Sequence, residues 1–318
     1  MDSPNSPPCE IPVVDFGGLI GTKGVASEAE WQRVGKELHD ALSGVGFVYL
    51  SNHGVTDEQI SNLFNTSASF FSLPEQTKAS YESDVESQHG YNSIGREELD
   101  AAKSLLELRE SFYMKNMDGA FPDAEVPLLR PAAAAFVASS TALAQRVLTA
   151  LALGLGLERD FFTSTHQYIC NRSPDANSSV LRINHYPPLA AAVPENAIRC
   201  GAHTDYGSIT LLFQDSMGGL QVRGNAGEWV HARPIPGTVL VNAGDLLQIW
   251  TANRLKATEH RVIIPKEETR LRASRLSAAF FVHPDNEVVV RPIDGASSPP
   301  PIKARQHLLN MYAKTYKY

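Results

Sequence analysis

The sequence predicts a mainly β protein with flanking helices, built from a helical front half and a β-rich second half. In the front half, apolar residues recur at helical spacing over long segments. Beyond residue 179 the pattern changes to many short β-rich runs separated by turn residues. Short strands at such intervals are typical of a sandwich, a jelly roll or a barrel. The second half is therefore predicted to form the core of the fold.

Three helices and two short strands are expected in the front half. Ser27 is predicted to be the N-cap of the first helix, with Glu30 closing a capping box. The strands are expected at residues 11–16 and 46–50, and the other helices at residues 56–71 and 132–155.

The second half is expected to contain nine short strands and a terminal helix. The strands are expected at residues 180–186, 198–203, 209–213, 220–222, 238–242, 246–250, 258–264, 276–283 and 287–290. A Pro-rich link at 297–301 leads to the helix at 303–312, and the polar segment 171–179 separates the two halves. We therefore divide the chain at 1–170, 171–292 and 293–318.

Composition narrows the classes of function. The 318 residues are 43% hydrophobic and 20% charged, a globular mixture that excludes a disordered, collagen-like or coiled-coil chain. A net charge of −7 attracts neither phosphate backbones nor anionic membranes, so we expect neither nucleic acid nor a membrane as partner. Cys9, Cys170 and Cys200 form no CxxC pair, which indicates a reducing compartment. Because we find no signal core and no apolar run that would span a bilayer, we expect a cytoplasmic location.

The residues most informative about chemistry are His203, Asp205 and His260. His203 and Asp205 stand two apart at the end of an expected strand, so both side chains leave the same face. Two histidines and one carboxylate form the facial triad of non-haem Fe(II) oxygenases, which leaves open positions on the metal. Taken alone, an HxD pair is more often a surface or turn feature, and a single histidine is more often structural.

A second pair strengthens the metal hypothesis. Arg275 and Ser277 stand two apart in an apolar strand, shortly after His260. A buried guanidinium is costly without an anionic partner, and its fork shape suits a carboxylate. The nearby sequence offers no obvious partner, so a ligand carboxylate is the candidate.

With these residues in place, the chain resembles the isopenicillin N synthase-like family of Fe(II)/2-oxoglutarate-dependent dioxygenases over nearly its whole length. The resemblance is carried by IPVVDF, GFVYLSNHGV, FFSLPEQTK, LRINHYPP, HTD, VNAGDLLQIW, TEHRV and RLS, in this order. The stretch HTDYGSITLLFQDSMGGLQV is similar to the fungal branch that includes thymine 7-hydroxylase. The resemblance implies a double-stranded β-helix (jelly roll) core with an N-terminal α/β region.

The resemblance also implies a role for individual residues. It makes His203, Asp205 and His260 the iron ligands. Residues that hold 2-oxoglutarate are Arg275, Ser277, Tyr186 and Asn184. Substrate-contacting residues are Arg182, Tyr206 and Phe281, although aromatic packing on the sheet is the alternative for the last two. Residues 90–96 and 108–112 resemble a stretch that caps the mouth of the active site, with ordinary inter-domain surface as the alternative.

The expected function is an Fe(II)- and 2-oxoglutarate-dependent oxidation of a small organic metabolite, which releases succinate and CO2. O2 is the oxidant, ascorbate is a stimulating reductant, and the oligomeric state is left open. Hydroxylation is the default outcome, with desaturation or ring closure as alternatives. The rival functions are an oxidase that needs no 2-oxoglutarate, a non-catalytic binding module on the same fold, and a zinc hydrolase. The last has no use for Arg275 and Ser277.

Overall fold

Two β-sheets that pack against each other form the centre of the protein. The structure is a computed structural model that describes residues 10–21, 26–83, 88–96, 105–170, 175–189, 193–265, 271–296 and 299–315. Within these residues, the large sheet has eight strands in the order β1 (Val13–Asp15), β2 (Phe47–Ser51), β12 (Thr238–Ala243), β9 (Ile209–Gln214), β14 (Arg275–Val282), β6 (Val180–Tyr186), β5 (Glu110–Met114) and β3 (Gly90–Asn92). The small sheet has four, in the order β11 (Trp229–His231), β10 (Leu220–Arg223), β13 (His260–Val262) and β8 (Cys200–His203). Two further pairs join β15 (Val289–Val290) to β16 (Ile302–Lys303) and β4 (Leu106–Glu107) to β7 (Ala197–Ile198).

Alternation along the strands separates two faces of the large sheet. On β14, Ala278, Phe280 and Val282 belong to the main hydrophobic core on the helical side. Arg275 and Ser277, on the opposite face, line a cavity between the sheets. The small sheet closes this side, where Leu220, Val222 and Val262 pack with Phe47 and Tyr186 of the large sheet in a second core. The mainly β fold and the jelly-roll core are confirmed.

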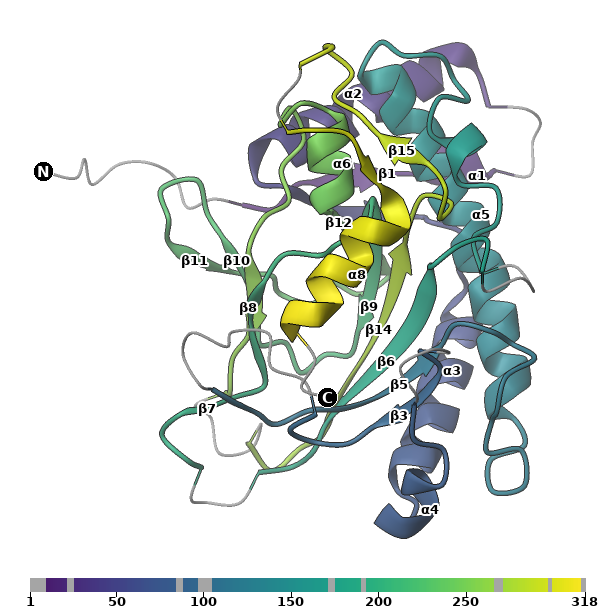
Figure 1. The fold of residues 1–318 in the computed structure, drawn as a ribbon, viewed down its shortest axis with the longest axis vertical. Coiled ribbons are helices and arrows are strands. Elements are labelled where there is room, and N and C mark those ends of the chain that lie inside the picture. The colour runs from purple at the N-terminus through teal and green to yellow at the C-terminus, as the bar shows by residue number, and fades with distance from the viewer. Residues whose placement is uncertain are drawn as a thin grey trace, which may run out of the picture.

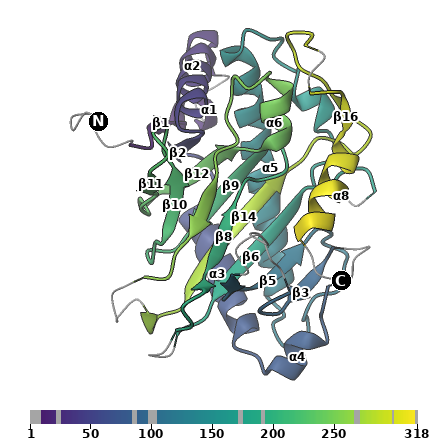
Figure 2. The ribbon, with the colours of Figure 1, turned by 60° about the vertical axis from the view of Figure 1, so that its left-hand side comes forward.

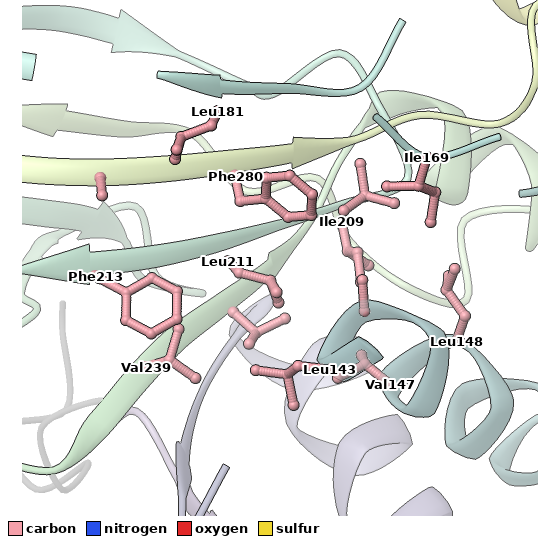
Figure 3. Close-up of a cluster of buried hydrophobic side chains, with 14 of the residues drawn as sticks. Leu143, Val147, Leu148, Ile169, Leu181, Ile209, Leu211, Phe213, Val239 and Phe280 are labelled. Carbon is pink, nitrogen blue, oxygen red and sulfur yellow. The ribbon is translucent and has the colours of Figure 1, made fainter. Parts of the chain in front are cut away.

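Helices cover the outer face of the large sheet. The longest are α2 (Glu28–Gly44), α3 (Asp57–Phe71) and α5 (Leu129–Gly154), and Figures 1 and 2 show α3 and α5 along this face. In Figure 3, Leu143, Val147 and Leu148 of α5 point at the strands that carry Leu211 and Phe280. The helices α2 and α5 touch at Gly35 and Gly154, where a Cβ on Gly154 would lie 2.1 Å from the Gly35 carbonyl oxygen. Glycine at both positions permits this approach.

The expectation that no apolar run would span a bilayer is wrong by length and composition. Among the described residues, α5 is long and apolar enough to do so, but 56% of its most apolar window is buried inside the protein. Its contacts with α2, α3 and the large sheet are those of a core helix.

The remaining helices are short, apart from the terminal one. They are α1 (Gly17–Ile20), α4 (Glu75–Ala79), α6 (Asp245–Trp250), a 3-10 turn at Thr163–Thr165, and α8 (Ala304–Thr315). Figure 2 shows α8 on the side of the large sheet opposite α5. The terminal helix expected at 303–312 is therefore present, and it extends three residues further.

One expected strand is wrong. Residues 246–250 form α6, because a short apolar run has no periodicity that separates a strand from a buried helix. Gly244 begins this helix in an extended conformation, and its carbonyl accepts the first helical bond from the Gln248 amide. A Cβ on Gly244 would lie 2.4 Å from the carbonyl oxygen of Gly207, so this glycine also lets α6 begin directly beside residues 205–208.

Other expectations hold or change in detail. Ser27 is the N-cap of α2 and accepts from the Glu30 amide over 3.2 Å, but the Glu30 side chain binds Arg33 instead of closing a box. The segments 90–96 and 108–112 contain β3 and part of β5, whose residues are buried in the large sheet. Whether these segments cap the mouth of the active site or form inter-domain surface stays a prediction. Cys9 and parts of the segments 171–179 and 297–301 lie outside the described residues, and the division at residues 170 and 292 stays a prediction.

Candidate active site

The structure brings His203, Asp205 and His260 together at one end of the small sheet. His203 ends β8 and His260 begins β13, and the two are direct partners in the antiparallel pairing. Asp205 Oδ1 lies 3.8 Å from His203 Nε2 and 3.6 Å from His260 Nε2. One ligand atom from each residue lies within 4.8 Å of the others, a spacing that suits three ligands of a single metal ion.

Hydrogen bonds orient all three side chains toward the same point. His203 Nδ1 donates to the Gly201 carbonyl over 2.9 Å, and His260 Nδ1 donates to the Thr258 carbonyl over 3.1 Å. Each Nε2 therefore keeps its lone pair for a metal. Asp205 Oδ2 accepts from two side chains of the large sheet, which leaves Oδ1 facing the histidines.

Burial and neighbouring charges set the protonation states. Burial lowers the pKa of His260 to about 4, and His203 beside it acts in the same direction. Burial alone would raise the pKa of Asp205, but the two imidazoles and the hydrogen bonds it accepts outweigh this and lower the pKa. A neutral imidazole and an ionised carboxylate are the forms that bind a divalent metal, so this donor set fits Fe(II).

The residues expected to hold 2-oxoglutarate lie across from the metal ligands. Arg275 pairs with Tyr186 and Ser277 with Asn184 in the β14–β6 ladder. All four side chains line one cavity together with the three metal-ligand candidates. We call this space the inner cavity. It lies between the two sheets, since β14 and β6 belong to the large sheet and β8 and β13 to the small one.

The surroundings of the Arg275 guanidinium favour the binding of an anion. The residue is 1% exposed, and its guanidinium lies over the Tyr186 ring, 4.7 Å from the ring centre. It donates long hydrogen bonds of 3.3 Å to Ser277 and to Gln214, and no acidic side chain among the described residues pairs with it. Its Nε and the Oδ1 of Asn184 have no hydrogen-bond partner in the described part of the chain. A buried cation with spare donors fits the carboxylate of 2-oxoglutarate.

The three expected substrate residues line a second space beside the metal-ligand candidates. Arg182, Tyr206 and Phe281 line a second cavity, which we call the outer pocket. It shares Arg182, Phe281, His203 and Asp205 with the inner cavity. The two spaces therefore meet at the metal-ligand candidates.

Contacts in the outer pocket fix these side chains. Arg182 lies over the Tyr113 ring, with its guanidinium carbon 4.7 Å from the ring centre. Tyr206 shares a hydrogen bond of 2.6 Å with Thr315 of α8. Aromatic packing on the sheet was the alternative role for Phe281 and Tyr206. Packing alone does not describe these side chains, because both also line the pocket.

Sequence reasoning missed several lining residues. The side chains of Leu308 and Tyr312 on α8 form one wall of the outer pocket, and no pattern in the helix indicated this. Arg109 lines the inner cavity, where it forms an ion pair with Glu107, and Gln214 binds Arg275. The alternation of β9, in which Thr210 and Gln214 share a face, would have indicated Gln214.

Comparison with known proteins gives the class. A family model described as the 2OG-Fe(II) oxygenase superfamily matches residues 177–284, and one described as the N-terminal region of non-haem dioxygenase in morphine synthesis matches residues 11–132. The 2-oxoglutarate-Fe(II) type oxidoreductase ppzD of Metarhizium majus is 31% identical over 295 residues, covering 80% of each chain. The proline hydroxylase buaE of Petromyces alliaceus is 34% identical over 273 residues, covering 80% of this chain and 83% of the relative.

A solved structure agrees with these matches. The full-length thymine 7-hydroxylase of Neurospora crassa in complex with alpha-KG superposes with a TM-score of 0.83 at 31% identity, covering 95% of this chain and 96% of that chain. Its complex with alpha-KG and thymine superposes with a TM-score of 0.81.

The fold and site thus define a non-haem iron oxygenase, and the chain belongs to the 2OG-Fe(II) oxygenase superfamily. It is a 2-oxoglutarate-dependent dioxygenase that oxidises a small metabolite with Fe(II) and 2-oxoglutarate. These matches favour this activity over an oxidase that needs no 2-oxoglutarate and over a non-catalytic module.

Proposed function

We propose that this chain oxidises an unactivated or methyl C–H bond of a small, flat, ring-containing molecule held in the outer pocket. The observation that carries the proposal is the position of this pocket, which meets the inner cavity at His203 and Asp205. A molecule in the outer pocket would therefore lie beside the residues that would hold the metal, while 2-oxoglutarate would occupy the inner cavity. When bound, Fe(II) with 2-oxoglutarate and O2 supplies the oxidant for the C–H bond.

The protein's own residues bind and orient the reactants. His203, Asp205 and His260 are proposed to hold Fe(II) on one face. Arg275, with Ser277 and Tyr186 beside it, pairs with the far carboxylate of 2-oxoglutarate. Asn184 lines the same cavity, and its side-chain amide completes the binding site for 2-oxoglutarate.

The lining of the outer pocket favours a ring as substrate. Arg182 supplies a cationic donor, while Tyr206 and Phe281 supply aromatic faces. Leu308 and Tyr312 of α8 form another wall of the outer pocket and would exclude water from a bound substrate. The complex of the Neurospora crassa protein with thymine supports a molecule of this shape.

A substrate screen tests the proposal. Thymine and related nucleobases are the first candidates, followed by polyketides, alkaloids and N-heterocyclic acids. Succinate formation is measured together with mass spectrometry for a gain of one oxygen or a loss of two hydrogens. We expect at least one ring compound to raise succinate formation above the rate without substrate. Oxidation of peptides or oligonucleotides alone, with every small molecule inert, would overturn the proposal.

A further inference from the structure

One polar side chain in the outer pocket has no role in the scheme above. His283 directly follows β14, on the same face of the strand as Phe281. The residue is 4% exposed and lines the outer pocket with Arg182 and Phe281. Within the described part of the chain, its ring nitrogens make no hydrogen bond. Ring nitrogens that line a cavity without a partner in the protein are available to a ligand, so the position of His283 points to one.

The backbone around His283 fixes the ring in place. The His283 amide donates to Ser179 Oγ over 2.9 Å, and its carbonyl accepts from Asn177 Nδ2 over 2.9 Å. The ring packs over Gly207, where an added Cβ would lie 3.1 Å from Nδ1 and Cε1 of the imidazole. Gly207 is two residues after Asp205, so the ring is held close to the metal-ligand candidates but outside their group. The site is thus preorganised.

The strand register places His283 and Arg182 at different levels of the pocket. Arg182 pairs with Ala279, and His283 lies four residues further along the same strand. At about 3.3 Å per residue, the two levels are about 13 Å apart, with Phe281 halfway between them. The pocket therefore offers a polar group at each end and an aromatic ring in the middle.

We infer that His283 is a specificity-determining residue, which hydrogen-bonds to an uncharged polar group of the substrate at the end opposite Arg182. The inference rests on the proposed function and narrows its substrate class to flat molecules that are polar at both ends. An amide or lactam edge suits this position, because a neutral imidazole offers one donor and one acceptor. Burial, with His307 and His166 nearby, lowers the pKa of His283 to about 3, which keeps the ring neutral.

The test compares variants of His283 with thymine, 1-methylthymine, 3-methylthymine and a set of N-heterocyclic carboxylic acids as probes. Succinate formation identifies the compound that stimulates wild-type enzyme most. His283→Leu should then raise the KM for this compound about tenfold or more, because leucine cannot replace the hydrogen bond to the substrate's buried polar group. His283→Gln should restore much of the affinity.

Three readouts separate this role from a structural one. In His283→Leu, the KM for 2-oxoglutarate and the succinate rate without substrate should stay at wild-type values. Some methylated probes should bind the wild-type enzyme more weakly than the unmethylated compound does. In His283→Leu, such a probe and the unmethylated compound should have equal KM values. The control His231→Leu, on the exposed side of β11, should change nothing. If the leucine variant does not fold, His283→Asn replaces it, because its shorter amide does not reach the ligand.

The outcomes distinguish the two proposals. If ring compounds stimulate wild type but the His283 variants keep the wild-type KM, the assignment of His283 is wrong and the proposed function stands. If no ring compound stimulates wild type, the proposed substrate class is wrong, and the His283 inference falls with it.

Discussion

Asn242 fixes the rotation of the Asp205 carboxylate. Asn242 Nδ2 donates to Asp205 Oδ2 over 2.7 Å, and Thr210 Oγ1 donates to the same oxygen over 2.6 Å. The two donors are direct partners in the β12–β9 ladder. Because both bind Oδ2, the other oxygen faces His203 and His260. The large sheet thus orients a ligand candidate that lies beside the small sheet.

This relationship predicts that Asn242→Leu weakens iron binding. The variant keeps a side chain of similar size but removes the donor, so the carboxylate is free to rotate. Loss of such an outer partner typically costs about 10–100-fold in metal affinity or activity. Titration with Fe(II) under anaerobic conditions measures the effect. The control Asn62→Leu, exposed on α3, should bind iron as wild type does, and an unchanged affinity in Asn242→Leu would contradict the prediction.

Asp205→Ala should abolish iron binding and turnover. The substitution removes the only anionic group of the three metal-ligand candidates, and two neutral imidazoles alone hold Fe(II) weakly. The fold should survive, because the side chain lines a cavity. Iron content after gel filtration and succinate formation measure the result, and circular dichroism checks the fold. A variant that retains iron and normal turnover would rule out the ligand assignment.

Arg275→Ala should impair use of 2-oxoglutarate while iron binding stays nearly intact. Loss of one partner of a buried, charge-assisted pair costs about 2–5 kcal/mol, which corresponds to a rise in KM of about 30-fold or more. Arg275→Lys should recover only part of this, because an ammonium lacks the planar fork. Steady-state kinetics with varied 2-oxoglutarate measure the effect, with Arg223→Ala, which changes the one exposed residue of β10, as control. Equal KM values in wild type and Arg275→Ala would place the co-substrate elsewhere.

Phe281→Ala should separate substrate turnover from 2-oxoglutarate decarboxylation. The ring lies between the two polar ends of the outer pocket, and its loss leaves the substrate poorly oriented. Product formation should fall far more than succinate formation measured without substrate. Tyr168→Ala, which removes an exposed aromatic ring, is the control. A parallel loss of both activities would instead indicate that Phe281 supports the fold.

Strand alternation explains how much of the site could be predicted. The strand expected at residues 180–186 matches β6 at both ends, and the spacing of Asn184 and Tyr186 places them on the cavity side. The same two-residue spacing in the HxD pair and in Arg275 and Ser277 identifies residues that share a face. Local pattern alone did not show that these two pairs lie across one cavity, because His203 and Arg275 belong to different sheets.

Other parts of the site depend on contacts between distant segments. The side chains of α8 line the outer pocket, where Thr315 binds Tyr206 from 109 residues away in the sequence. His283 ends the strand expected at residues 276–283, but nothing in its local sequence shows that Gly207 leaves room for its ring. The helix α6 was missed because its apolar run is too short to show a period. Such features follow from tertiary packing and not from local pattern.

The buried His166 predicts that the protein loses stability between pH 6.5 and pH 4. Its Nδ1 donates to the Phe162 carbonyl over 2.7 Å, and its Nε2 accepts from Ser208 Oγ over 2.8 Å. Burial lowers its pKa to about 4, whereas histidine in an unfolded chain has a pKa of about 6.5. Between these values the unfolded state binds a proton that the folded state does not, so the free energy of unfolding falls as the pH falls. The loss attributable to His166 is about 3 kcal/mol at pH 4 and vanishes above pH 6.5. Urea unfolding at a series of pH values should show a shallower pH dependence in His166→Gln than in wild type, and His231→Gln should keep the wild-type slope. Equal slopes in wild type and His166→Gln would show that this imidazole does not titrate on unfolding.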